Sequence, residues 1–76
     1  MNTKELNIKS VKLMLGAEMR RVREEKGLSV EETAAAAGIE RSNVIRNLEA
    51  GRGSKIYFIF KLLEIYQKRL SVRLVD

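Results

Sequence analysis

The sequence predicts a mainly α-helical domain of four to five helices that ends in a short β-strand. Apolar residues recur at spacings of three and four over most of the chain, which is the period of a helix with one buried face. Glycines at positions 27, 38 and 51 divide this pattern into segments of helical length. After residue 68 apolar and polar residues alternate, as they do along a strand.

Length and composition restrict the class of protein. The 76 residues leave room for one domain, which we divide into a helical core over residues 11–68 and a strand over residues 69–76. Histidine and cysteine are absent, which excludes disulfides, thiolate metal sites and the usual nucleophile–base pairs. We therefore expect no enzyme activity, metal or cofactor. No stretch has the apolar character of a signal peptide or a membrane span, so we expect a cytoplasmic protein.

The net charge of +5 favours a polyanionic partner, but the charge is unevenly distributed. Residues 28–53 carry three basic and four acidic side chains, whereas the segments on both sides are basic. Attraction to a polyanion would therefore come mainly from flanking residues such as Lys9, Lys12 and Lys55.

The first helix is predicted over residues 11–26. One face carries apolar residues at spacings of four, four and three: Val11, Leu15, Met19 and Val22. The opposite face is charged, and Gly27 is placed to end the helix.

A short helix follows, because Ser29 is placed to cap the free N–H groups of a segment whose first turn carries Glu31 and Glu32. Four consecutive alanines, residues 34–37, allow another helix to approach closely. Gly38 then supplies a residue that leaves the helix with positive φ.

A second short helix is predicted from about Ser42. Its apolar residues would face the core: Val44, Ile45 and Leu48. Its polar residues would face outward: Arg41, Ser42, Asn43, Arg46 and Asn47.

This pair of helices resembles the lambda-repressor and Cro-like helix-turn-helix family, often called XRE-type, over roughly residues 15–66. The resemblance rests on Arg23, Gly27-Leu28-Ser29, Glu31-Glu32, Ala34, Gly38-Ile39 and Leu48-Glu49-Ala50-Gly51. It implies a sequence-specific DNA-binding transcription regulator, most simply a dimeric bacterial repressor. It also implies an ion pair between Arg23 and Glu49 that ties the first helix to the end of the recognition helix.

In a helix-turn-helix the second helix lies in the major groove and its first residues reach base edges. Arg41 and Arg46 are candidates for guanine, and Asn43 or Asn47 for adenine. Ser42 either reads a base or caps the recognition helix. The remaining candidates would contact the DNA backbone: Ser29, Arg52, Ser54 and Lys55.

Three residues or spacings depart from the family pattern. Val30 stands where many members have Gln, and Thr33 stands where a large aliphatic residue is usual. The span from Gly38 to Glu49 is one residue longer than usual, so either Arg46 or Asn47 occupies the reading position in the middle of the helix.

Ser54 is placed to cap a last helix that runs to about Gln67. Its apolar residues are Ile56, Ile59, Phe60, Leu62, Leu63 and Tyr66. Residues 56–60 are five consecutive large apolar residues, more than one buried stripe holds, so a second chain is expected to cover the excess.

Residues 69–76 have a strand pattern, with Leu70, Val72 and Leu74 on one face. No internal partner strand is evident, so we expect a homodimer in which two copies form an antiparallel ribbon. The resemblance supports this, because some compact members, including several antitoxins, end in such a strand. A frayed tail or an added helical turn is the alternative.

Two other functions compete with the repressor. An antitoxin of the same fold would bind operator DNA and also neutralise a toxin protein through exposed apolar surface. A protein-interaction adaptor would use the helices without reading DNA, and the net negative charge of residues 28–53 favours it.

Overall fold

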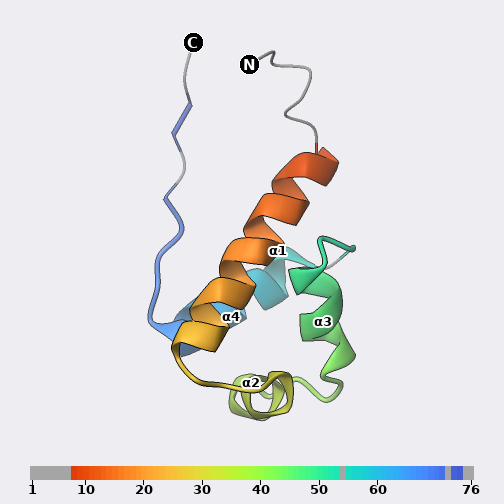
Figure 1. Ribbon diagram of the computed structural model, residues 1–76, viewed down its shortest axis with the longest axis vertical. Coiled ribbons are helices and arrows are strands. Elements are labelled where there is room, and N and C mark those ends of the chain that lie inside the picture. Colours follow the sequence, from red (N-terminus) through yellow and green to blue (C-terminus); the bar gives the residue numbers. More distant parts are fainter. Residues whose placement is uncertain (1–7, 54, 72, 75–76) are drawn as a thin grey trace.

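The computed structural model describes residues 8–53, 55–71 and 73–74 (Figure 1). This part of the chain contains four helices, and the prediction of a mainly helical fold is confirmed. The helices are α1 (Ile8–Glu25), α2 (Val30–Ala37), α3 (Asn43–Glu49) and α4 (Ile56–Tyr66).

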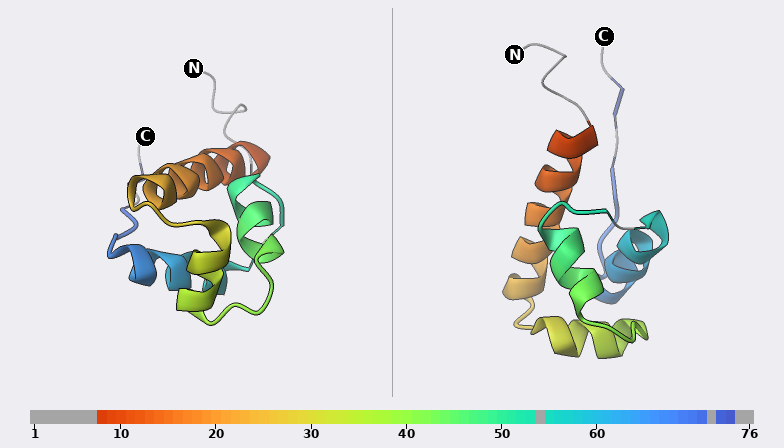
Figure 2. Two further views of the ribbon diagram at one scale, coloured as in Figure 1. Left: turned by 60° about the horizontal axis from the view of Figure 1, so that its bottom comes forward. Right: turned by 90° about the vertical axis from the view of Figure 1, so that its right-hand side faces the viewer.

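The helices enclose a single small core. Helix α2 lies across the end of the domain where α1 finishes, and α3 and α4 stand above it (Figures 1 and 2). Every helix contributes apolar side chains to the core, which consists of Met19, Val22, Ala34, Ala37, Ile39, Ile45, Leu48, Leu62, Leu63 and Tyr66.

The amino-terminal half of α1 is more exposed than its sequence pattern indicates. The helix begins at Ile8, three residues before the predicted start, and its first turns project beyond α3 and α4 (Figures 1 and 2). Val11 is consequently 51% exposed, and its predicted place on a buried face is wrong. The buried residues of the helix are Gly16, Met19 and Val22.

Local signals define α2 as predicted. The Ser29 hydroxyl accepts a hydrogen bond from the Glu32 backbone N–H at 3.0 Å, and the Ser29 N–H donates to the Glu32 carboxylate at 2.9 Å. This reciprocal capping box satisfies two groups at the helix start. At the other end Gly38 has a φ of 69°, so the predicted left-handed turn is confirmed.

Helix α4 starts at Ile56, and Lys55 occupies the N-cap position without a capping hydrogen bond from its side chain. The predicted cap, Ser54, lies outside the described residues. Leu62, Leu63 and Tyr66 are buried as expected. The prediction is wrong for two other residues, Ile56 and Phe60, which are exposed because α4 packs through one side only.

Thr33, where the family that the sequence resembles would have a large aliphatic residue, is fully buried. Burial raises the pKa of Tyr66, and the Thr33 hydroxyl beside it opposes this shift. Neither hydroxyl makes a hydrogen bond of regular geometry within the described part of the chain. Two hydroxyl groups are therefore buried in this small core without a regular hydrogen bond, which lowers the free energy of unfolding.

After α4 the chain turns at Gln67, whose φ is 57°, and runs back toward the end of the molecule where α1 begins (Figures 1 and 2). Within residues 68–71 and 73–74 no strand is found. A strand forms only beside another strand, and the described chain provides none. Leu70 and Leu74 are exposed, Leu74 by 98%, while Val72 lies outside the described residues.

Candidate nucleic-acid interface

Helix α3 has one buried face and one face that carries polar side chains. Ile45 and Leu48 are inserted in the core. Arg46 and Asn47 follow Asn43 by three and four residues, so all three lie on the opposite face of the helix. Asn43 and Arg46 are exposed and Asn47 is half-buried. The structure therefore brings three of the predicted base-reading residues together.

A glycine of α1 sets how closely α3 lies. A Cβ atom built on Gly16 would be 2.4 Å from the Leu48 carbonyl oxygen and 2.7 Å from that of Glu49. Backbone atoms cannot yield as a flexible side chain does, so only glycine fits here. Gly16 was not predictable from the sequence, because its apolar neighbours form an ordinary helical stripe and no turn marks the position.

The predicted ion pair between Arg23 and Glu49 is confirmed. Arg23 Nε and Nη2 donate to the two Glu49 carboxylate oxygens at 2.7 and 3.2 Å, and Nη1 donates to the Leu28 carbonyl at 2.7 Å. The two side chains are only 12% and 8% exposed. One guanidinium thus links the end of α1, the start of α2 and the end of α3.

Alanine at Arg23 or at Glu49 should each lower the free energy of unfolding by about 3 kcal/mol, because a largely buried charge loses its partner. The double variant should cost less than the sum of the two. Denaturant unfolding of the four proteins measures this. Arg20 and Glu24, an exposed pair on α1, form the control, and their cycle should give a coupling of about 0.5 kcal/mol or less. Additive costs for Arg23 and Glu49 would contradict the coupling.

The remaining residues at the start of α3 differ in their contacts. Ser42 stands at the N-cap but makes no capping hydrogen bond. Its hydroxyl instead accepts a hydrogen bond from Arg46 Nη1 at 2.8 Å, so the capping alternative is not found. The backbone carbonyl of Arg41 accepts a hydrogen bond from the Val44 N–H at 3.1 Å, while its side chain is exposed and makes no hydrogen bond or ion pair within the described ranges.

The residues predicted to meet the DNA backbone lie on both sides of α3. The hydroxyl of Ser29 accepts from Glu32, which leaves its own proton free to donate. The backbone N–H of Arg52 donates to the Asn47 carbonyl at 2.8 Å, and Lys55 is exposed. Ser54 falls outside the described residues.

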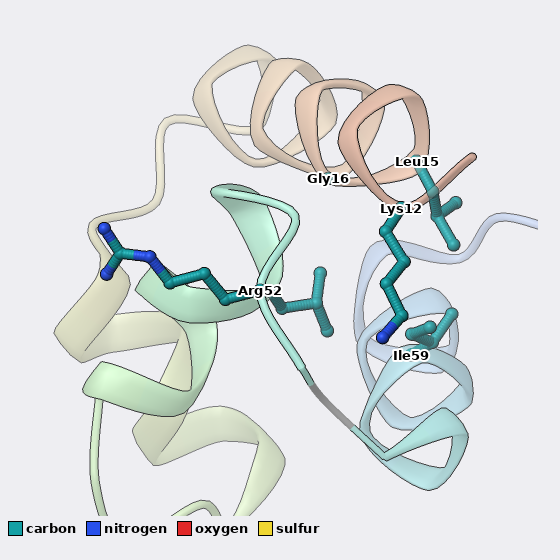
Figure 3. Close-up of a pocket in the computed structure, with 6 residues that line it drawn as sticks. Lys12, Leu15, Gly16, Arg52 and Ile59 are labelled. Atoms are coloured by element: carbon teal, nitrogen blue, oxygen red, sulfur yellow. The ribbon is translucent and has the colours of Figure 1, made fainter. Parts of the chain in front are cut away.

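Figure 3 shows a small hollow where α1 meets α4 and the end of α3. It is lined by Lys12, Leu15, Gly16, Leu48, Arg52 and Ile59. The Lys12 side chain extends toward Ile59, and the Arg52 side chain points away from the hollow. The volume of this hollow, about 30 Å³, is far below that of a binding site for an organic ligand.

A second surface depression connects three helices on the other flank of α3. It is lined by Arg20, Arg23, Val30, Arg46, Glu49 and Ala50. Each of its three arginines is paired with a carboxylate, Arg23 with Glu49, Arg20 with Glu24 and Arg46 with Glu31.

A family model described as a helix-turn-helix domain matches residues 14–67, which include all four helices except the first turns of α1. No curated protein and no solved structure matches the chain significantly. In the described part of the chain, no helix has the length and apolar character needed to cross a membrane.

Proposed function

The chain belongs to the helix-turn-helix domain family, and from this premise we propose that it is a sequence-specific DNA-binding regulator that acts as a homodimeric repressor. The observation that carries the proposal is the outward face of α3, where Asn43, Arg46 and Asn47 stand on a helix whose other face is held in the core. Side chains of these types bond pairs of atoms on base edges.

In this proposal α3 enters the major groove, and α2 crosses the DNA backbone. The capped start of α2 at Ser29 directs backbone N–H groups toward a phosphate. Arg52 and Lys55, which follow α3, contact the backbone on the other side. Occupation of a promoter by two such domains blocks transcription.

Selection of bound sequences from random duplex DNA tests the proposal. A regulator should enrich one motif, and a homodimer should enrich a palindrome whose half-sites lie about 10 base pairs apart. An adaptor that does not read DNA would enrich no motif and would bind all duplexes weakly and with strong salt dependence.

Arg41→Ala and Arg46→Ala should each weaken operator binding by about 1 to 3 kcal/mol and relax the preference at particular base pairs. Lys55→Ala should weaken binding to operator and random duplexes alike, because a phosphate contact carries no sequence information. Titration of each variant with both duplexes gives the comparison. Equal losses on the two duplexes for both arginine variants would contradict their assignment to base edges.

A second candidate function is that of an antitoxin, and the exposed apolar side of α4 favours it. Ile56, Tyr57 and Phe60 are 67, 61 and 52% exposed, which is unusual for neighbouring large side chains of a small domain. In this alternative the protein binds a toxin encoded beside it as well as DNA. Relief of that toxin's growth arrest by the wild type, and its loss in Tyr57→Lys, would support this function.

A further inference from the structure

Arg46, the outward arginine of α3, is already held by three groups of the protein. Its Nη2 donates to the Glu31 carboxylate at 2.5 Å. Its Nη1 donates to the Ser42 hydroxyl at 2.8 Å and, more weakly, to the Asn43 side-chain oxygen at 3.4 Å. Glu31 belongs to the first turn of α2, fifteen residues earlier in the chain, so the contact joins the two helices of the motif.

We propose that Glu31 is a positioning residue that determines the DNA specificity of this domain, by holding the Arg46 guanidinium along the outward face of α3. This inference rests on the proposed DNA-reading function of α3. Glu31 itself touches no base in it. Its carboxylate sets the direction in which the arginine's remaining N–H groups point.

The exposure of the Glu31–Arg46 pair indicates that it orients the arginine side chain and does not stabilise the fold. The Arg46 and Glu31 side chains are 50% and 63% exposed, and ion pairs in such positions add little to stability. A guanidinium has five N–H donors in a rigid planar fork. With its Nη1 and Nη2 edge restrained by Glu31 and Ser42, fewer orientations of the fork are available, and less rotamer entropy is lost on binding a base.

The negative charge of Glu31 also opposes contacts with DNA phosphates, which do not depend on sequence. An unrestrained arginine reaches phosphates as easily as base edges, and a phosphate contact is independent of sequence. Glu31 lies in the first turn of the helix that crosses the backbone, where its negative charge opposes the attraction of the helix start for a phosphate. It should therefore weaken binding to random DNA while it favours the contact between Arg46 and a base.

Glu31→Gln removes the charge and keeps the length and helix propensity of the side chain. The ratio of operator affinity to random-duplex affinity should fall about five- to tenfold, a part of what a full bidentate base contact provides. Operator binding should weaken while random binding strengthens. Titrations of both duplexes at one salt concentration measure the ratio.

Glu40→Gln is the matched control. Glu40 is exposed in the turn between α2 and α3 and makes no ion pair within the described ranges. Its neutralisation removes the same charge near the interface without releasing Arg46. Both affinities should rise together and the ratio should stay constant. An equal fall in the ratio for Glu31→Gln and Glu40→Gln would show a general charge effect and overturn the positioning role.

A double-mutant cycle separates positioning from other effects. In an Arg46→Ala background Glu31→Gln should no longer lower the specificity ratio, because the residue that it positions is gone. The same loss in both backgrounds would overturn the proposal. A merely structural role of Glu31 would change unfolding without this dependence on Arg46.

A titration without DNA checks the contact itself. The hydrogen bond from Arg46 lowers the pKa of Glu31, and Arg46→Ala should raise that pKa in NMR titrations of the carboxyl. An unchanged pKa would overturn the contact and the proposal. A wild type that selects no DNA motif would refute the proposed function, before any variant is made, and the positioning role with it. A selected motif with an unchanged ratio in Glu31→Gln would refute only the positioning role.

Discussion

Deletion of residues 69–76 is expected to leave a folded helical domain that is monomeric and binds its operator at least about a hundredfold more weakly. In the proposed homodimer each subunit presents one α3 helix and would read one half-site. Pairing of two carboxyl-terminal strands would set two such helices about 34 Å apart, on one face of the duplex. The 98% exposure of Leu74 agrees with this, since a side chain that covers no part of its own domain is available to a second copy, and Leu70 is 43% exposed.

Sedimentation and operator titration of the truncated protein measure both effects. Leu74→Lys is a milder change than the deletion and should weaken the same dimer contact. The Leu74 side chain is 98% exposed, so its replacement leaves the domain's own core intact. Ser71→Lys places the same group on the opposite face of the strand and is its control. A truncated protein that remains a dimer with unchanged operator affinity would refute the strand contact. The dimer interface would then move to the apolar helix α4, around Tyr57 and Phe58.

Gly16→Ala is expected to lower the free energy of unfolding by about 3 kcal/mol or more, because the added methyl group would overlap the backbone of α3. The three nearest atoms to it all belong to the backbone of Leu48 and Glu49. Helix α3 would have to move away from α1. The Arg23–Glu49 pair would stretch, and operator affinity would fall together with stability.

The expected loss of stability in Gly16→Ala is opposite to the usual effect of this substitution in a helix. Alanine in place of glycine in an open helix stabilises by about 1 kcal/mol, so the contact with α3 must reverse the usual result. Gly53→Ala is the control, because no atom beyond the neighbouring residues of the chain lies within 4 Å of a Cβ built there. Urea unfolding of the two variants gives the comparison. A Gly16→Ala protein at least as stable as the wild type would show that α1 and α3 pack less closely than described.

Local features of the structure were predictable because they depend on neighbouring residues. Ser29 with Glu32 forms a cap within one helical turn, and Gly38 adopts the backbone conformation that other residues resist. The start of α1 and the burial of Val11 were not predictable in this way. Periodicity shows which residues share a face of a helix, and it cannot show how far the neighbouring helices extend along that face.

The sequence by itself determined the helix pair, its glycine turn, the outward polar face of α3 and, through the family resemblance, the link between Arg23 and Glu49. Each follows from short-range spacing or from a pattern shared with related chains. Only the tertiary structure decided that Gly16 admits α3 to within atomic contact and that Glu31 holds Arg46. These residues lie 32 and 15 positions from their partners, Leu48 and Arg46. Contacts over such separations depend on how whole helices cross, and helix crossing is set by side-chain packing across the core.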